Sequence, residues 1–387
     1  MILSLFTVRR SPFELSRRSF ERILLVKPSS LGDVVHALPV LHGLRTRYPN
    51  AKIDWLIATP FAPLLESHFE LDELILFDRR RFGRIGRSPR ATREFVRFVR
   101  DLRDRHYGLV IDLQGLFRTG FLTWASGAGV RIGFRNAREG AWLFYTHRLR
   151  VDESETHAVD RNYRVAELLG FEDVPIEFNQ TLPESVRAEA RNLLRERGLT
   201  GEGRLVVVVP GARWETKTWL PERFAETIDE LHGRNLARCV LVGGPDEVTL
   251  CERIATACRS GPINLAGRTT VQQLAAVVGL ANLVLCHDSA AMHLAVALER
   301  PLVCLVGPTN PLRTGPYRRA DDVVRLELDC APCYLRRLSR CPHDHRCMKE
   351  LDVGTVVAAV ERSLSRPAVD PVQSTTMRGK PRDNLSI

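Results

Sequence analysis

Short apolar runs alternate with longer segments of helical composition along most of the chain. In the first half, such runs predict strands at 22–27, 52–57, 74–77, 109–113 and 131–134. The same order begins again in the second half, with strands expected at 204–209, 238–242, 263–265, 283–286 and 302–306. Alternating strands and helices are typical of parallel sheets covered by helices, so we expect an α/β protein with two such units.

The stretch between the two halves, 172–202, has little periodicity and contains two prolines. A chain of 387 residues exceeds one ordinary domain, so we place a domain junction there. The expected divisions are an N-terminal extension at 1–20, one domain at 21–185, a second at 200–352, a helix at 353–365 and a disordered tail at 366–387. The extension has two open interpretations, a basic amphipathic segment on a membrane surface or a poorly ordered tail.

The segment 283–298 has the pattern of an anion site. His287, Asp288 and Ser289 follow an apolar strand and precede a helix that opens with Ala290. Small or capping residues at this point leave the free N–H groups of the helix open to a phosphate, which the helix dipole also favours.

The first strand runs into Ser29, Ser30, Gly32 and Asp33 without the glycine pattern of a nicotinamide dinucleotide site and without the lysine of a P-loop. Ligands of open α/β sheets bind at the carboxyl ends of the strands, so Asp33 is placed to act as a general base. Its alternative role is to cap the following helix.

Three motifs, at 27–36, 288–293 and 307–311, resemble those of the ADP-heptose:lipopolysaccharide heptosyltransferases, glycosyltransferase family nine. The resemblance covers nearly all of 22–364 and is strongest to the heptosyltransferase I branch, although Ala290 replaces the usual glycine. It implies a GT-B fold, in which two Rossmann-like domains face a cleft and the helix at 353–365 crosses back to the first domain. It also implies an inverting transfer of heptose from ADP-heptose to the Kdo-containing inner core of lipopolysaccharide, on Kdo-lipid A.

The resemblance assigns roles to individual residues. Asp33 and Lys217 would be catalytic, as base and as the cation at the departing phosphate. The donor would be bound by Arg213, Glu247, Thr269, Asp288, Ser289, Ala290 and His293. The acceptor would be bound by Ser29, Ser30, Gly32, Arg81, Arg84, Gln114, Arg118 and Arg138. Lys217 has the alternative of a surface lysine, and Glu247 that of a helix cap.

No cofactor is required in this interpretation, and the enzyme would work in the cytoplasm with peripheral contact to the inner membrane. Two alternatives remain: a GT-B transferase for another nucleotide sugar or acceptor, and a non-catalytic protein that binds nucleotide sugars or polyanions.

The net charge of +10 indicates an acidic partner. Arginines are concentrated at 79–105, where they form either an anion-binding rim or a solvated helix face. Nucleic acid is not expected, because no recognised nucleic-acid-binding motif accompanies the charge.

Cys330, Cys333, Cys341 and Cys347 lie close together in the sequence with two histidines between them. This density satisfies the ligand count of a structural zinc, although the spacing is not that of a standard finger. Disulfides and reduced thiols are the alternatives.

Overall fold

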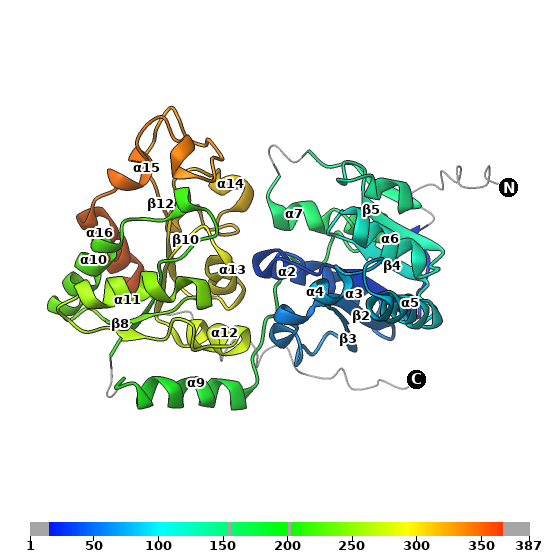
Figure 1. Cartoon of the computed structure of the whole chain (residues 1–387), viewed down its shortest axis with the longest axis horizontal. Helices are drawn as coiled ribbons and strands as arrows, with labels where there is room; N and C mark the ends of the chain where they lie inside the picture. The colour runs from blue at the N-terminus through cyan, green and yellow to red at the C-terminus, as the bar shows by residue number, and fades with distance from the viewer. Residues whose placement is uncertain (1–14, 153–155, 200–202, 367–387) are drawn as a thin grey trace, which may run out of the picture.

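The computed structural model describes residues 15–152, 156–199 and 203–366, which form two α/β domains side by side (Figure 1). Each domain is built on a six-stranded sheet in which neighbouring strands pair in parallel. The α/β class and the two-sheet organisation expected from the sequence are confirmed. The expectations for the extension and the tail fall almost entirely on 1–14 and 367–387, outside the described residues.

The first sheet has the order β3-β2-β1-β4-β5-β6. Its strands are β1 (Arg22–Val26), β2 (Lys52–Ala58), β3 (Glu73–Phe77), β4 (Leu109–Asp112), β5 (Val130–Phe134) and β6 (His147–Leu149). The helices of this half are α2 (Leu31–Val35), α3 (Leu38–Arg47), η1 (Thr59–Leu64), α4 (Arg79–Phe82), α5 (Pro89–Asp104), α6 (Phe117–Ala125), η2 (Ala141–Phe144), α7 (Ala158–Tyr163) and α8 (Ala166–Leu169).

The second sheet has the order β12-β11-β10-β7-β8-β9. Its strands are β7 (Leu205–Val209), β8 (Arg238–Leu241), β9 (Ile263–Asn264), β10 (Leu283–His287), β11 (Leu302–Leu305) and β12 (Val323–Val324). Its helices are α9 (Glu184–Glu196), η3 (Glu215–Lys217), α10 (Pro221–Gly233), η4 (Pro245–Glu247), α11 (Val248–Ala257), α12 (Val271–Leu280), α13 (Ala290–Ala297), α14 (Pro311–Thr314), η5 (Ala320–Asp322), η6 (Leu338–Arg340), α15 (Arg346–Lys349) and α16 (Val353–Ser365).

The edge strands β6 and β12 were absent from the sequence expectation. β6 has three residues and β12 has two, so both strands are too short to show a hydrophobic pattern in the sequence. The other strands agree with the expected ones to within a few residues, because most of them are buried apolar runs, such as β7, in which all five residues are buried.

Two helices change the expected domain division. α9 packs against α12 and so belongs with the second domain, although the expected boundary left most of it unassigned. α16 packs on α10, β10 and β11 of its own domain, with Val356 and Val360 buried in that domain's core. The expectation that this helix crosses back is therefore wrong: its apolar face already covers the second sheet.

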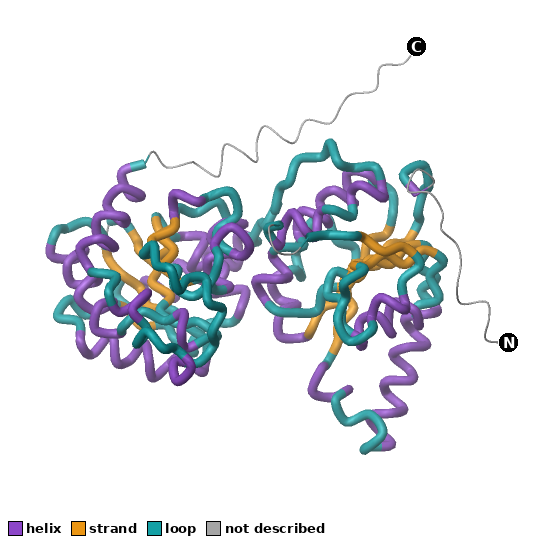
Figure 2. Tube along the Cα trace, turned by 90° about the horizontal axis from the view of Figure 1, so that it is seen from above, coloured by secondary structure: helices purple, strands orange, loops and turns teal. Residues whose placement is uncertain are grey.

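The carboxyl ends of the central strands position the loops that matter for function. β1 and β4 are neighbours in the first sheet, and β10, β7 and β8 are neighbours in the second. Between the domains, α2 lies against α13 (Figure 1). Away from this contact, α4 and α5 form an arm that projects from the first domain (Figure 2).

The chain leaving the first domain is anchored by Phe171, which is buried against α3. A Cβ atom added to Gly43 of α3 would lie 2.4 Å from Cε2 of that ring. Gly43→Ala should therefore lower the free energy of unfolding by about 1–3 kcal/mol, despite the better helix propensity of alanine. Gly233→Ala, at an open position of α10, is the control and should be neutral or slightly stabilising. Denaturant unfolding measures both, and equal stability of the two variants would contradict this packing.

Candidate active site

Asp33 lies in the first turn of α2, at the carboxyl end of β1. Its Oδ2 accepts hydrogen bonds from the Ser30 backbone N–H at 3.0 Å and from Ser30 Oγ at 2.7 Å. Ser30, rather than Asp33, occupies the N-cap position. The Asp33 side chain is 45% exposed, so the carboxylate stabilises the helix start and still remains accessible.

Lys27 is the buried partner of Asp33 and was not expected as a site residue from its sequence pattern. Its Nζ lies 3.5 Å from Asp33 Oδ1 and donates to the Leu113 carbonyl at 3.0 Å. Burial opposes ionisation of Asp33, but the Lys27 ammonium and the Ser30 hydrogen bonds outweigh it and lower the pKa of this carboxyl. The group is therefore ionised at neutral pH and able to accept a proton.

On the second domain, Lys217 is held by Asp288. Its Nζ donates to Asp288 Oδ2 at 2.8 Å and to the Asp288 carbonyl at 3.2 Å, and it lies 4.6 Å from the centre of the Trp214 ring. Asp288 Oδ2 also accepts from Thr309 Oγ1 at 2.7 Å. Lys217 is thus fixed at the carboxyl end of β10 and is not a loose surface lysine.

Ser289 is the N-cap residue of α13, but its side chain makes no capping hydrogen bond. Its Oγ is buried and has no hydrogen-bond partner among the described residues. An unsatisfied buried hydroxyl at an uncapped helix N-terminus is the arrangement that a bound phosphate would complete. Ala290 is the first residue of the same helix.

The two domains are joined beside these groups by side-chain hydrogen bonds. His36 Nε2 and His293 Nδ1 are 2.8 Å apart, His157 Nε2 donates to the Gly315 carbonyl at 3.0 Å, and Tyr317 Oη donates to Asp160 Oδ1 at 2.6 Å. Each pair takes one residue from each domain. No local sequence pattern indicates these partnerships, because the partners are far apart along the chain.

His293 is influenced by the charge of Asp33 on the first domain and by those of Asp288 and Lys217 on the second. Burial lowers its pKa to about 4, while the carboxylates of Asp288 and Asp33 act in the opposite direction and Lys217 adds to the lowering. Burial also lowers the pKa of His36 well below the ordinary value. Both imidazoles are neutral at pH 7, and His293 is within electrostatic reach of Asp33 and Lys217 together.

Gly32 lies under His293. A Cβ atom at this position would lie 2.5 Å from His293 Cδ2, so only glycine allows the two helices to approach this closely. Gly32 therefore forms part of the domain contact, and its expected place on the acceptor side stays a prediction.

The remaining donor-side candidates surround the carboxyl ends of the second sheet. Glu247 Oε2 accepts from the Gly244 N–H at 2.7 Å, and its Oε1 lies over Gly211. The carboxylate therefore caps its own turn and also lies across the end of β7. Arg213 is exposed and Thr269 half-buried on neighbouring loops.

The acceptor-side candidates lie around the first sheet. Gln114 Oε1 accepts from the Ser29 N–H at 3.4 Å, and Arg79, which was not among the selected residues, reaches Ser29 Oγ at 3.5 Å. Arg118 and Arg138 are exposed. Arg81 forms an ion pair with Glu94, whereas Arg84 is exposed on the loop that follows α4.

The cysteine cluster does not form the zinc site that its spacing allowed. Within the described part of the chain, no group of three or more His, Cys, Asp or Glu residues could hold a metal ion, and all four thiols are free. Cys341 Sγ accepts from the His345 N–H at 3.4 Å, and His345 Nε2 donates to the Thr216 carbonyl at 2.8 Å. These groups serve the loop that supports Lys217.

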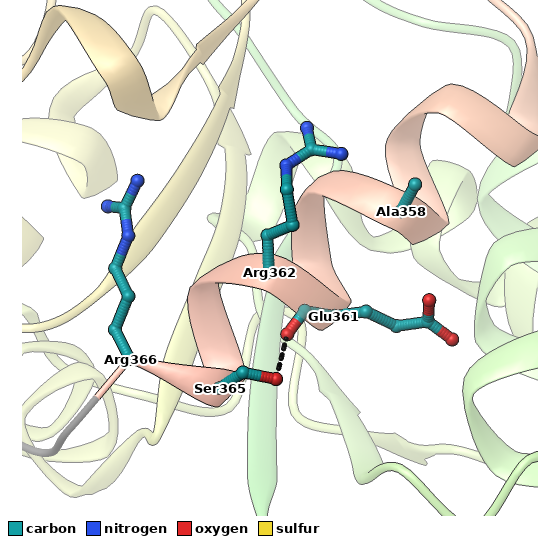
Figure 3. Close-up of a pocket in the computed structure, with 5 residues that line it drawn as sticks. All are labelled: Ala358, Glu361, Arg362, Ser365 and Arg366. Carbon is teal, nitrogen blue, oxygen red and sulfur yellow. Dashed lines mark hydrogen bonds between the residues drawn. The ribbon is translucent and has the colours of Figure 1, made fainter.

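A shallow hollow on α16 lies away from these groups (Figure 3). Its lining residues are Ala358, Glu361, Arg362, Ser365 and Arg366. Glu361 forms an ion pair with Arg234, and Arg366 forms one with Asp322. Two of the charged side chains that line the hollow are therefore already paired within the second domain. We therefore place the functional site at the facing ends of the sheets, where charged and buried polar groups converge.

Comparison with known proteins agrees with this arrangement. The model of glycosyltransferase family 9 (heptosyltransferase) matches residues 95–342. The chain is similar to lipopolysaccharide heptosyltransferase 1 of Pseudomonas aeruginosa, at 31% identity over 81% of this chain and 86% of the relative. It is also similar to lipopolysaccharide heptosyltransferase 3 of Escherichia coli, at 30% identity over 87% and 96%. The solved structure of E. coli heptosyltransferase WaaC with ADP-2-deoxy-2-fluoro heptose matches with a TM-score of 0.67 and 26% identity, covering 88% of this chain and 99% of that one.

Two parallel-sheet domains that face each other across a site of this kind define a GT-B glycosyltransferase. The chain belongs to glycosyltransferase family 9, the heptosyltransferase family. Heptosyltransferases 1 and 3 match at nearly equal identity, so the comparisons establish the family and not a branch within it. Within the described ranges, no helix has both the length and the apolar composition needed to cross a bilayer.

The role of Lys27 leads to a prediction. Lys27→Met should raise the pKa of Asp33, because it removes the buried cation that favours the carboxylate. The ion pair stabilises the fold above the ordinary carboxyl pKa of 3.8 and is lost as the pH falls through the lowered value. An NMR-monitored titration of the Asp33 carboxyl measures the shift, with the exposed Lys52→Met as control. The same Asp33 pKa in both variants would show that Lys27 does not set it.

Proposed function

We propose that this enzyme transfers heptose from ADP-heptose to the Kdo-containing inner core of lipopolysaccharide, with inversion at the anomeric carbon. The observation that carries the proposal is that α2, which contains Asp33, packs against α13, which begins directly after Asp288, the residue that holds Lys217. One reaction can then use a base from the first domain and cations from the second.

Asp33 is the proposed general base. Attack of an acceptor hydroxyl on the anomeric carbon requires a group that accepts the hydroxyl proton, and this carboxylate is ionised and partly exposed. A base on the face opposite the leaving group produces inversion in a single displacement. The lowered pKa makes the base weaker but ensures that it is deprotonated.

The leaving ADP is the proposed ligand of the second domain. Lys217 supplies a fixed positive charge, and the N–H groups of α13 with the unpartnered Ser289 Oγ supply donors for the departing phosphate. These groups stabilise negative charge as the bond to the sugar breaks. Glu247 is the proposed ligand of the ribose hydroxyls.

The acceptor side is proposed to use arginine. Phosphates and Kdo carboxylates on the inner core are anions that guanidinium groups can bind in a bidentate manner. The arginine candidates on the first domain are Arg79, Arg81, Arg84, Arg118 and Arg138, and Gln114 is proposed to act with them. We further propose that the enzyme works at the cytoplasmic face of the inner membrane, where a lipid-anchored acceptor of this kind would be reached.

ADP release from ADP-heptose in the presence of a Kdo-lipid acceptor tests the reaction directly. Asp33→Asn should keep ADP affinity near that of the wild type and reduce kcat by about a hundredfold or more, because it removes basicity while preserving size. Asp352→Asn, which alters a helix cap outside the cleft, is the matched control and should retain its rate. Normal turnover of Asp33→Asn would assign this residue to helix capping alone.

The arginine loop gives an independent prediction. Replacing both Arg81 and Arg84 with Ala should raise the acceptor KM about tenfold, the effect of losing one charge-assisted contact, and leave the donor KM nearly unchanged. The wild-type acceptor KM should rise with salt, and that of the variant less steeply, because exposed charges are screened beyond about 8 Å. The control removes Arg195 and Arg197, two exposed arginines at the end of α9. Identical kinetics in both double variants would leave the loop as solvated surface.

A further inference from the structure

A group of exposed apolar side chains covers α6 and η2 of the first domain. We call Phe117, Trp124, Trp142 and Leu143 the aromatic patch; their exposed fractions are 53, 49, 37 and 52%. α6 and η2 pack directly against each other, so the four side chains belong to one surface. Clustered apolar groups of this size on a protein surface mark an interaction site more often than chance exposure.

The aromatic patch rests on a layer of further rings. Phe121 lies 5.8 Å from Trp124 and 6.4 Å from Phe144, and Phe144 lies 5.4 Å from Phe117, centre to centre. This layer holds the outer side chains in place. The exposed rings are therefore presented on a rigid support and do not depend on a flexible loop.

Exposed arginines surround the aromatic patch. The Arg148 guanidinium lies 5.0 Å from the centre of the Trp142 ring, and Arg103 of α5 packs beside Gly127, just after α6. Arg118 follows Phe117 in α6, but its guanidinium lies 6.0 Å from the centre of the Phe77 ring, so the arginines with positions beside the patch are Arg148 and Arg103. The neighbouring Glu139 accepts a hydrogen bond from the Phe117 N–H at 3.1 Å and so caps the helix. The surface combines apolar rings with positive charge.

We propose that the aromatic patch docks on the surface of an anionic phospholipid bilayer. Tryptophan prefers the interface between headgroups and acyl chains, and each arginine near an anionic leaflet adds to the attraction. A second copy of this chain fits less well: in a two-fold symmetric dimer, the arginines around one patch would meet those around the other. The charge complementarity therefore favours the lipid surface.

The placement of the patch relative to the site agrees with this occupant. α6 begins two residues after Gly115, in the loop that leaves the carboxyl end of β4 and carries Gln114. Docking through α6 would hold the acceptor side of the cleft close to the bilayer. The membrane contact can be tested without any substrate, so its failure and the failure of the proposed reaction are distinguishable.

The test is co-sedimentation of the full chain with vesicles of phosphatidylglycerol and phosphatidylethanolamine, compared with vesicles of phosphatidylcholine. The wild type should bind the anionic vesicles selectively. Replacing Trp142 and Leu143 together with Ser should weaken binding about tenfold or more, since both apolar side chains leave the interface. The matched control replaces Leu312 and Leu338, exposed leucines of the second domain, and should bind like the wild type.

A second variant tests the role of the arginines and leaves the apolar side chains of the aromatic patch unchanged. Arg103→Glu combined with Arg148→Glu should abolish the preference for phosphatidylglycerol while circular dichroism shows an unchanged fold. The proposal would be overturned if the wild-type protein did not co-sediment with anionic vesicles, or if the patch and control variants bound these vesicles equally. Sedimentation velocity gives the other decisive result: a wild-type dimer that the patch variant converts to monomer would show that the surface joins two copies.

Discussion

A buried ammonium group is the constraint around which the first half of the site is organised. Lys27 directly follows the central strand β1 of its sheet and is buried. Removal of its ammonium group from water costs free energy unless the charge is compensated. Compensation comes from Asp33 on the following turn and from the Leu113 carbonyl at the end of the neighbouring strand. The backbone carbonyl of Lys27 itself accepts a hydrogen bond from Trp55 Nε1 at 3.1 Å, which connects a third strand, β2, to this residue. The geometry of the carboxylate is thus a product of sheet pairing as well as of its own helix.

In the second domain, the lysine of the candidate site is held in a different way. Lys217 is fixed in place by Asp288, whose carboxylate also accepts hydrogen bonds from Thr309 and Thr314, and the proposed reaction requires that this lysine remain available to an anion. A partly neutralised lysine attracts the resting ligand less strongly than a free one. In the proposed reaction, this lysine is already in position when negative charge develops on the departing phosphate, which is the condition for efficient electrostatic stabilisation.

Local sequence was sufficient for much of this architecture. The apolar runs predicted nearly all the strands because parallel strands are buried on both faces, and the strand-to-helix turns located Asp33, Asp288 and Ser289 because ligand sites follow the carboxyl ends of strands. Contacts formed only by packing could not be predicted. The hydrogen bond between His36 and His293 joins residues 257 positions apart, and nothing local in either segment indicates the other. For the cysteines, composition suggested a ligand set whose geometry the folded loop does not provide.

The close fit of Gly32 beneath His293 has a consequence for how such enzymes can diversify. One residue belongs to the first domain and the other to the second, and Gly32 cannot gain a side chain unless His293 moves. The two domains are therefore not independent modules that recombination can exchange freely. A gene fusion that replaced the first domain as a whole would create a mismatched contact beside Asp33, so this architecture accommodates changes in its peripheral loops more readily than exchange of a whole domain.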